Sequence, residues 1–292
     1  MKNAGVRWSF VLSICLLAIL FTFGTANLRA ADFVTQLEEH YLKKVPLTEV
    51  DPNMTMEQAV RTQEQFVARL ARELGEPIGY KAGLTNPNIQ KALGVNQPVR
   101  GTLLKKMILE SGAVVQAKFG AVPMSEGDLI VRVKDEAINQ AKTADETLQY
   151  LDAVIPFIEL PDMVCDKSVK FNGPLLVAIN VGARYGVVGK PIPLAATPQW
   201  KERLRSFSVV IFDEKGDVVA EGKADALLGD PLNAVLWIKD SLASEGKKLK
   251  KGDLLSLGSL TKTMPVKPGT TVKAKYIGLD PQGPVEISVS FN

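Results

Sequence analysis

Three carboxylates lie in segments of this chain where an unpaired acid is not expected. Glu126 and Asp128 stand two residues apart in SEGDLIVRV, and Glu159 comes near the end of the apolar stretch AVIPFIEL. Side chains two residues apart in a strand share a face, which would place Glu126 and Asp128 about 7 Å apart. Burying an ionised carboxylate without a partner costs several kcal/mol. Three buried carboxylates therefore predict either protonation or a bound cation. Mg²⁺ and Mn²⁺ are suitable cations, because they prefer oxygen ligands and keep some bound water.

Each acid also has a simpler interpretation. Glu126 can lie on the solvated face of an edge strand, and Asp128 can be the residue that begins that strand. Glu159 can be an exposed acid at a strand end, since Leu-Pro-Asp follows it directly. The sequence alone does not bring the three side chains together.

Other polar residues also interrupt apolar surroundings. Lys81 lies in the tight segment IGYKAGLT, where it can orient an anionic substrate or move a proton, or can extend its ammonium into water. Asn180 interrupts LLVAIN, and a buried amide must find partners, either backbone or ligand. The turn GSLT places hydroxyls and free backbone N–H groups after an apolar strand, an arrangement that suits a carboxylate.

The elements that must position these side chains can be predicted from periodicity. Residues 33–45 form an amphipathic helix, and Thr55 with Gln58 begins a second one that ends at Gly75. Beyond residue 110 the pattern is of short strands, with a hairpin over residues 206–224. Asp230-Pro231 begins one later helix. Helices first and strands afterwards predict an α+β fold.

The N-terminus has the layout of a secretory signal. Basic residues come first, Trp8 to Phe23 is almost wholly apolar, and small residues fill the stretch up to Ala31. The apolar part is shorter than the roughly 20 residues of a spanning helix. We therefore expect export, as to a periplasm, with cleavage after Ala26, Ala30 or Ala31, of which the last two are favoured, and a retained anchor is the alternative.

The balance of charge excludes some partners. The whole chain has 35 Lys+Arg and 32 Asp+Glu, and residues 1–31 carry three basic residues and no acid. The mature chain is therefore near neutral, which argues against nucleic acid or an anionic membrane as partner. Cys165 and His40 are its only cysteine and histidine, which excludes an internal disulfide and a zinc site of several histidines. A lone thiol of this kind usually packs as a small apolar group.

Seven motifs together resemble the fumarylacetoacetate hydrolase superfamily, and specifically its 2-keto-4-pentenoate hydratase / 4-oxalocrotonate decarboxylase branch. The resemblance covers nearly all of residues 55–292, and the motifs occur in the order GYKAGLT, LGVNQPVRGTLL, SEGDLIVRV, VIPFIELPD, AINVGARYGVVG, LLGDPLNAVLWI and GDLLSLGSLT. Each motif is weak alone, but seven in order are specific. The resemblance implies a mixed β-roll that holds a divalent metal, usually Mg²⁺, and a homo-oligomer.

The resemblance also implies roles for individual residues. The metal ligands of the family fall on Glu126, Asp128 and Glu159, with Asp in place of the usual second Glu. Such an ion can chelate a 2-oxo acid and stabilise its enolate.

The substrate-side residues of the family fall on four further positions. These are the lysine at Lys81, which is also catalytic, the asparagine at Asn180, and the hydroxyls of Ser259 and Thr261 that receive the substrate carboxylate.

Two departures from the family pattern affect the expected chemistry. The motif usually reads Gly-Val-Asp-Gln-Pro, so the catalytic acid expected beside the lysine is here Asn96, which cannot ionise. Arg100 stands where an aromatic residue is frequent. It can pair with a second substrate carboxylate or, more simply, be a solvated surface arginine.

The sequence therefore predicts a signal peptide over residues 1–31, a helical N-terminal region over 32–100 and a β-roll catalytic domain over 101–292. The expected protein is an exported, metal-dependent lyase that hydrates or decarboxylates a short unsaturated 2-oxo acid. One alternative is a C–C bond hydrolase of acylpyruvates or β-diketones, for which His40 would have to act in the site. The other is a catalytically silent oxo-acid-binding protein, which Asn96 would explain.

Overall fold

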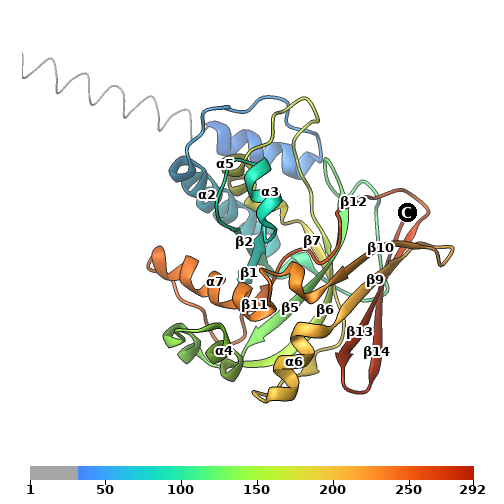
Figure 1. Ribbon diagram of the computed structural model, residues 1–292. Coiled ribbons are helices and arrows are strands. Elements are labelled where there is room, and N and C mark those ends of the chain that lie inside the picture. The colour runs from blue at the N-terminus through green and yellow to red at the C-terminus, as the bar shows by residue number, and fades with distance from the viewer. Residues whose placement is uncertain (1–31) are drawn as a thin grey trace, which may run out of the picture.

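Two β-sheets organise the computed structural model, which describes residues 32–292 (Figure 1). The nine-stranded sheet has the order β2-β1-β11-β5-β6-β7-β3, with β12 beside β5 and β8 beside β6. The second sheet has the order β10-β9-β13-β14-β4. The strands of the first sheet are β1 (Pro77–Gly83), β2 (Val99–Leu104), β3 (Ile108–Glu110), β5 (Met124–Val133), β6 (Leu151–Leu160), β7 (Tyr185–Val188), β8 (Ile192–Pro193), β11 (Leu254–Ser256) and β12 (Met264–Pro265).

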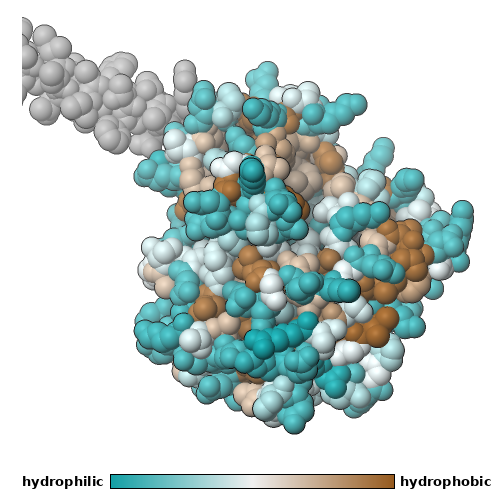
Figure 2. Space-filling model, in the orientation of Figure 1, coloured by the Kyte–Doolittle hydropathy of each residue, from teal (hydrophilic) through white to brown (hydrophobic). Residues whose placement is uncertain are grey.

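The five-stranded sheet stands at the right of Figure 1 and packs its inner face against the first sheet. Its strands are β4 (Ala113–Val115), β9 (Ser208–Phe212), β10 (Val218–Lys223), β13 (Thr271–Asp280) and β14 (Gly283–Phe291). The predicted hairpin is confirmed as β9–β10, with Gly216 in the turn at a φ of +86°. Figure 2 shows a mostly hydrophilic face, with the largest apolar patch at the right, over this sheet.

The longer helices begin and end where capping residues predict. In α2 (Met56–Leu74), Thr55 Oγ1 accepts from the Gln58 N–H at 3.2 Å and the Thr55 N–H donates to Gln58 Oε1 at 2.7 Å. In α7 (Pro231–Ser244), Asp230 Oδ1 accepts from the Leu232 N–H at 2.9 Å. The other helices are residues 32–43, α3 (Pro87–Ala92), α4 (Ala144–Thr147), α5 (Gly173–Ala178) and α6 (Pro198–Ser206), with 3₁₀ turns η1 (Lys105–Met107), η2 (Glu136–Gln140), η3 (Leu148–Tyr150), η4 (Asn180–Gly182) and η5 (Ala224–Ala226).

Residues 32–292 form two large apolar cores. One lies between the two sheets and under α7, and the other joins helix 32–43, α2 and α5 at the top of Figure 1. Cys165 is buried in the second core, as expected of a thiol that packs as a small apolar group. The expected boundary at residue 100 falls inside β2, and β1 lies in the same sheet. Residues 77–104 therefore share a sheet with the strands that follow.

The expected signal peptide over residues 1–31 lies outside the described residues. Within residues 32–292, no helix combines the length and the apolar character that crossing a membrane requires.

Candidate active site

The strand register places the predicted acids on one face of the nine-stranded sheet. Strands β5 and β6 are antiparallel, with Glu126 directly opposite Glu159 and Asp128 two residues further along β5. Opposed residues and their i+2 neighbours share a face. All three side chains are buried, with exposed fractions of 6%, 0% and 2% for Glu126, Asp128 and Glu159. The interpretations as solvated or strand-end acids are therefore wrong.

Lys81 joins this cluster from β1. Its Nζ forms an ion pair with Glu159 Oε1 and donates to the carbonyl oxygen of Val181 at 2.9 Å. The side chain is buried, which excludes the alternative of an ammonium in water. Its neighbour across β2 is Gly101, where a Cβ would stand only 2.9 Å from Lys81 Cγ and 2.7 Å from the Asn180 carbonyl oxygen. Glycine is therefore needed there so that the lysine stem can pass.

Hydroxyl groups from the segment after β11 hold Glu126. Ser259 Oγ donates to Glu126 Oε1 at 2.6 Å, and Thr263 Oγ1 donates to Glu126 Oε2. Ser259 was expected to receive a substrate carboxylate, and here it contacts a carboxylate of the protein. Thr263 carried no signal in the sequence, because it lies beyond the GSLT turn.

Asp128 is held by donors that the sequence did not single out. Ser256 Oγ donates to Asp128 Oδ2 at 2.7 Å, and the Gly258 N–H donates to Oδ1 at 3.1 Å. Ser256 pairs with Lys81 across the parallel β1–β11 contact, so it shares the face of the acids. A serine within the apolar strand LLSLG was the available signal.

The main chains that carry the acids are joined by a tyrosine from the other sheet. The Tyr276 hydroxyl lies 2.7 Å from the carbonyl oxygens of Asp128 and Phe157, and it accepts from the Phe157 N–H at 3.1 Å. Burial is the main reason why the pKa of this phenol is raised. Tyr276 therefore stays a neutral hydrogen-bonding group that fixes β5 against β6.

Asn180 and Thr261 both bind backbone close to the cluster. The Asn180 amide accepts from the Thr102 N–H at 2.7 Å and donates to the Thr102 carbonyl at 2.9 Å. Of the two alternatives for this buried amide, the tie to backbone is the one observed, and a contact with substrate stays a prediction. Thr261 Oγ1 accepts from the N–H of Gly127, between the two acids of β5, at 2.9 Å.

Asn96 is not brought to the acids. It is exposed in the loop before β2 and lines a groove that contains none of the three carboxylates and not Lys81. Arg100 lines the same groove and is 9% exposed, so its interpretation as a solvated surface arginine is wrong. The ring of His40 lies on the N-terminal helix with Nδ1 2.9 Å from the Val45 carbonyl oxygen, and it makes no described contact with the acids.

The cluster has more negative than positive groups. Burial raises the pKa of Asp128 well above its usual range, and the negative charge of Glu159 adds to this. Burial also raises the pKa of Glu159 to about 7, against the lowering effect of Lys81 and with a further raising effect of Glu126. One ammonium therefore does not compensate three carboxylates, and a divalent cation would.

The donor set fits a hard divalent ion, because all the available atoms are carboxylate and hydroxyl oxygens. Within residues 32–292, however, no three His, Cys, Asp or Glu side chains are positioned to bind one ion. Here the carboxylate oxygens accept from hydroxyl groups and from Lys81. Binding by all three acids therefore requires these side chains to turn from their present donors.

The raised pKa values predict how stability depends on pH. Between the ordinary Glu pKa of 4.5 and the folded value of about 7, the folded metal-free protein holds more protons than the unfolded chain. Its stability should therefore fall as pH rises through this range. The expected change is on the order of a few kcal/mol, because a pKa difference of one corresponds to about 1.4 kcal/mol. Thermal unfolding in EDTA at pH 5.5 and pH 8 measures it.

Metal should reverse this trend. Because a cation binds the ionised carboxylates, added Mg²⁺ should raise the melting temperature more at pH 8 than at pH 5.5. An equal effect of Mg²⁺ at both pH values would contradict a binding site on these acids.

Known proteins similar in sequence to this chain are lyases by name. The chain is 28% identical over 236 residues to a 2-keto-4-pentenoate hydratase of Paraburkholderia xenovorans (strain LB400), covering 80% of this chain and 85% of that protein. It is 28% identical over 245 residues to a 4-oxalocrotonate decarboxylase of Pseudomonas putida, covering 84% and 89%. No family model matches the chain.

Solved structures extend the similarity to the fold. The 4-oxalocrotonate decarboxylase from Pseudomonas putida G7, complexed with magnesium and adipate, has a TM-score of 0.78 and 25% identity over 91% of this chain and 98% of that one. The fumarylpyruvate hydrolase from Pseudomonas aeruginosa, in complex with Mn²⁺ and pyruvate, has a TM-score of 0.50 and 13% identity over 73% and 89%.

The two sheets and their few helices thus have the fold of the fumarylacetoacetate hydrolase family. Within that fold, this chain has homologues named 2-keto-4-pentenoate hydratase and 4-oxalocrotonate decarboxylase. The fold class and the resemblance drawn from the seven motifs are both confirmed.

Proposed function

We propose that this protein is a divalent-metal-dependent lyase that acts on a short unsaturated 2-oxo acid, by hydration or decarboxylation. The observation that carries the proposal is the set of three buried carboxylates and one buried lysine on a single sheet face. The hydratase and decarboxylase homologues support the reaction class. Solved neighbours with magnesium, calcium or Mn²⁺ support a divalent ion, for which we propose Mg²⁺ or Mn²⁺.

Glu126, Asp128 and Glu159 would hold the ion through carboxylate oxygens. When bound, it would supply the positive charge that stabilises negative charge developing on the oxygens of the 2-oxo acid. Lys81 would orient the substrate and give or take a proton at Nζ, since it is the one titratable base among residues 32–292 that is directly paired with these acids. Ser259 is partly exposed and has a hydroxyl that can turn from Glu126 to a substrate carboxylate.

The alternative of a catalytically silent protein depended on Asn96. Because Asn96 lines the separate groove, its inability to ionise removes no proton carrier from the cluster around Lys81. The hydrolase alternative depended on His40. The ring of His40 contacts the Val45 carbonyl oxygen, just after the N-terminal helix. Neither observation favours these alternatives over a lyase.

A turnover assay tests the proposal. Purified protein should consume 2-keto-4-pentenoate, with loss of its ultraviolet absorbance, or should release CO₂ from 4-oxalocrotonate. EDTA should stop the reaction, and Mg²⁺ or Mn²⁺ should restore it. Mg²⁺-dependent binding of oxalate without turnover on either compound would instead identify a silent binding protein. Cleavage of an acylpyruvate that requires His40 would identify a hydrolase.

Export and assembly are further parts of the proposal. We infer from the N-terminal sequence that residues 1–31 direct export to a periplasm and are then removed, leaving no stable membrane association. N-terminal sequencing of the mature protein should begin directly after Ala30 or Ala31. A homo-oligomer is expected by resemblance, and light scattering of the purified protein measures it.

A further inference from the structure

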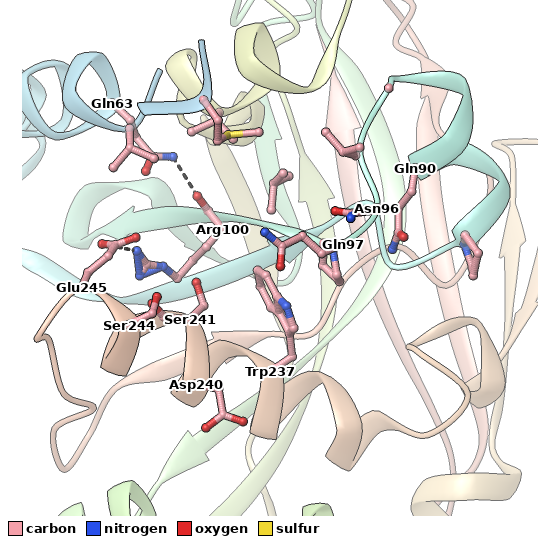
Figure 3. Close-up of a pocket in the computed structure, with 18 of the residues that line it drawn as sticks. Gln63, Gln90, Asn96, Gln97, Arg100, Trp237, Asp240, Ser241, Ser244 and Glu245 are labelled. Carbon is pink, nitrogen blue, oxygen red and sulfur yellow. Dashed lines mark hydrogen bonds and ion pairs between the residues drawn. The ribbon is translucent and has the colours of Figure 1, made fainter. Parts of the chain in front are cut away.

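A groove of about 1110 Å³ lies at the β2 edge of the nine-stranded sheet, between α2 and α7 (Figure 3). It is separate from the acid cluster. Across the β1–β2 ladder, Lys81 pairs with Gly101, whereas Arg100 pairs with Ala82. Because successive residues of a strand face opposite sides, Arg100 and Lys81 lie on different faces of the sheet.

Arg100 has an unsatisfied donor in the wall of this groove. Its side chain is only 8% exposed, and Nη2 binds Glu245 Oε2 at 2.7 Å. The guanidinium lies over the Tyr80 ring, 5.4 Å from its centroid. Its Nη1 is buried and is the only such side-chain nitrogen or oxygen of residues 32–292 without a hydrogen-bond partner. A buried N–H without an acceptor is unfavourable, so an acceptor from a ligand would be stabilising.

The charges beside Arg100 favour an anionic acceptor. Glu245 is shared with a second cation, because Lys247 Nζ lies 2.8 Å from the same oxygen, Oε2. Lys247 also pairs with Glu64 at 2.6 Å, but that carboxylate is 50% exposed and therefore screened by water. One carboxylate thus contacts two cations at the wall, so it compensates the guanidinium of Arg100 only in part.

The rest of the groove suits an apolar group. Val60 of α2, Val99 of β2 and Val177 of α5 line it together with Trp237, which is half-buried on α7. Figure 3 shows Trp237 rising from α7 between Arg100 and Asn96. The volume is that of a pocket for a small organic molecule, and such pockets combine apolar walls with a few polar groups.

We propose that this groove binds a monocarboxylate with an apolar tail, whose carboxylate accepts from Arg100 Nη1 and whose tail packs on Trp237 and the valines. Since Nη1 is covered, entry of the ligand includes a shift of a rim side chain, and exposed Gln97 is such a group. The site does not depend on the proposed lyase activity, because its anion-binding group, Arg100, lies on the opposite face of the sheet from Lys81.

Titration calorimetry of the metal-free protein with hexanoate tests this site. Binding should saturate, and hexanamide, its uncharged analogue, should bind at least about tenfold more weakly, because hydrogen bonds to charged groups are the stronger ones. Glu159→Gln should leave hexanoate affinity unchanged. Equal affinity for hexanoate and hexanamide, or loss of binding in Glu159→Gln, would overturn the proposal.

Matched variants locate the binding. Arg100→Gln should weaken hexanoate binding by about tenfold or more. Lys91→Gln removes the same charge from the exposed rim of the groove and should weaken it by less than about twofold. Equal losses in the two variants would mean that binding is only non-specific attraction. If Arg100→Gln does not fold, Glu245→Gln tests the site instead. This variant removes the carboxylate that pairs with the Arg100 guanidinium, so hexanoate binding should tighten severalfold. Unchanged or weaker binding would contradict the site.

Discussion

Replacing Glu159 by Gln should reduce Mg²⁺-dependent turnover by roughly three orders of magnitude, because it removes one charge from the ion site and leaves Lys81 without its partner. The amide keeps the size of the side chain, so the buried sheet face should still pack. Steady-state assays on 2-keto-4-pentenoate and 4-oxalocrotonate measure the loss, and calorimetry with Mg²⁺ should show weaker metal binding in parallel.

Glu110→Gln is the matched control for this variant. Glu110 is an exposed residue of β3, the edge strand of the same sheet. Its replacement should leave turnover and Mg²⁺ affinity as they are. Full activity in Glu159→Gln would remove the basis for an active site at these acids.

Replacing Lys81 by Met should separate catalysis from metal binding. The variant loses the group that gives or takes the proton, so turnover should fall by about 10²- to 10⁴-fold. Mg²⁺ affinity should be equal or higher, because the ammonium no longer competes for Glu159. Activity assays and calorimetry on the same preparation measure both quantities.

Lys106→Met serves as control, because Lys106 is an exposed lysine just after β2. A Lys81→Met protein that had lost Mg²⁺ binding together with activity would indicate that the lysine only supports the shape of the cluster. Retained turnover in that variant would exclude Lys81 as the proton carrier.

The acid cluster could be predicted because its members break strong local patterns. A carboxylate in an apolar strand is visible in the sequence, and strand periodicity correctly placed Glu126 and Asp128 on one face. That Glu159 lies opposite Glu126 could not be read from the sequence, because register depends on pairing between strands far apart in the chain.

Other features depended on tertiary contacts that leave no local pattern. Arg100 is buried because α2 and α7 flank the edge strand β2. These two helices are far apart in the sequence. Tyr276 is an ordinary strand residue type, so nothing marks it until the fold brings its hydroxyl to the Asp128 carbonyl oxygen. Ser256 was marked only as a serine within an apolar strand, and its contact with Asp128 depends on the fold. The boundary at residue 100 followed a change in residue pattern, whereas hydrogen bonding continues across it through β2.

Tyr276 makes the geometry of one sheet depend on the other. Its hydroxyl comes from β13, yet it sets the spacing of the β5 and β6 backbones on whose far side the acids converge. An insertion or deletion of one residue in β13 before Tyr276 would turn this side chain to the opposite face and remove a hydroxyl donor from the buried Asp128 and Phe157 carbonyl oxygens. Strand β13 contributes no acid to the cluster. Its length is nevertheless constrained, because Tyr276 must reach the strands of the other sheet that carry the acids.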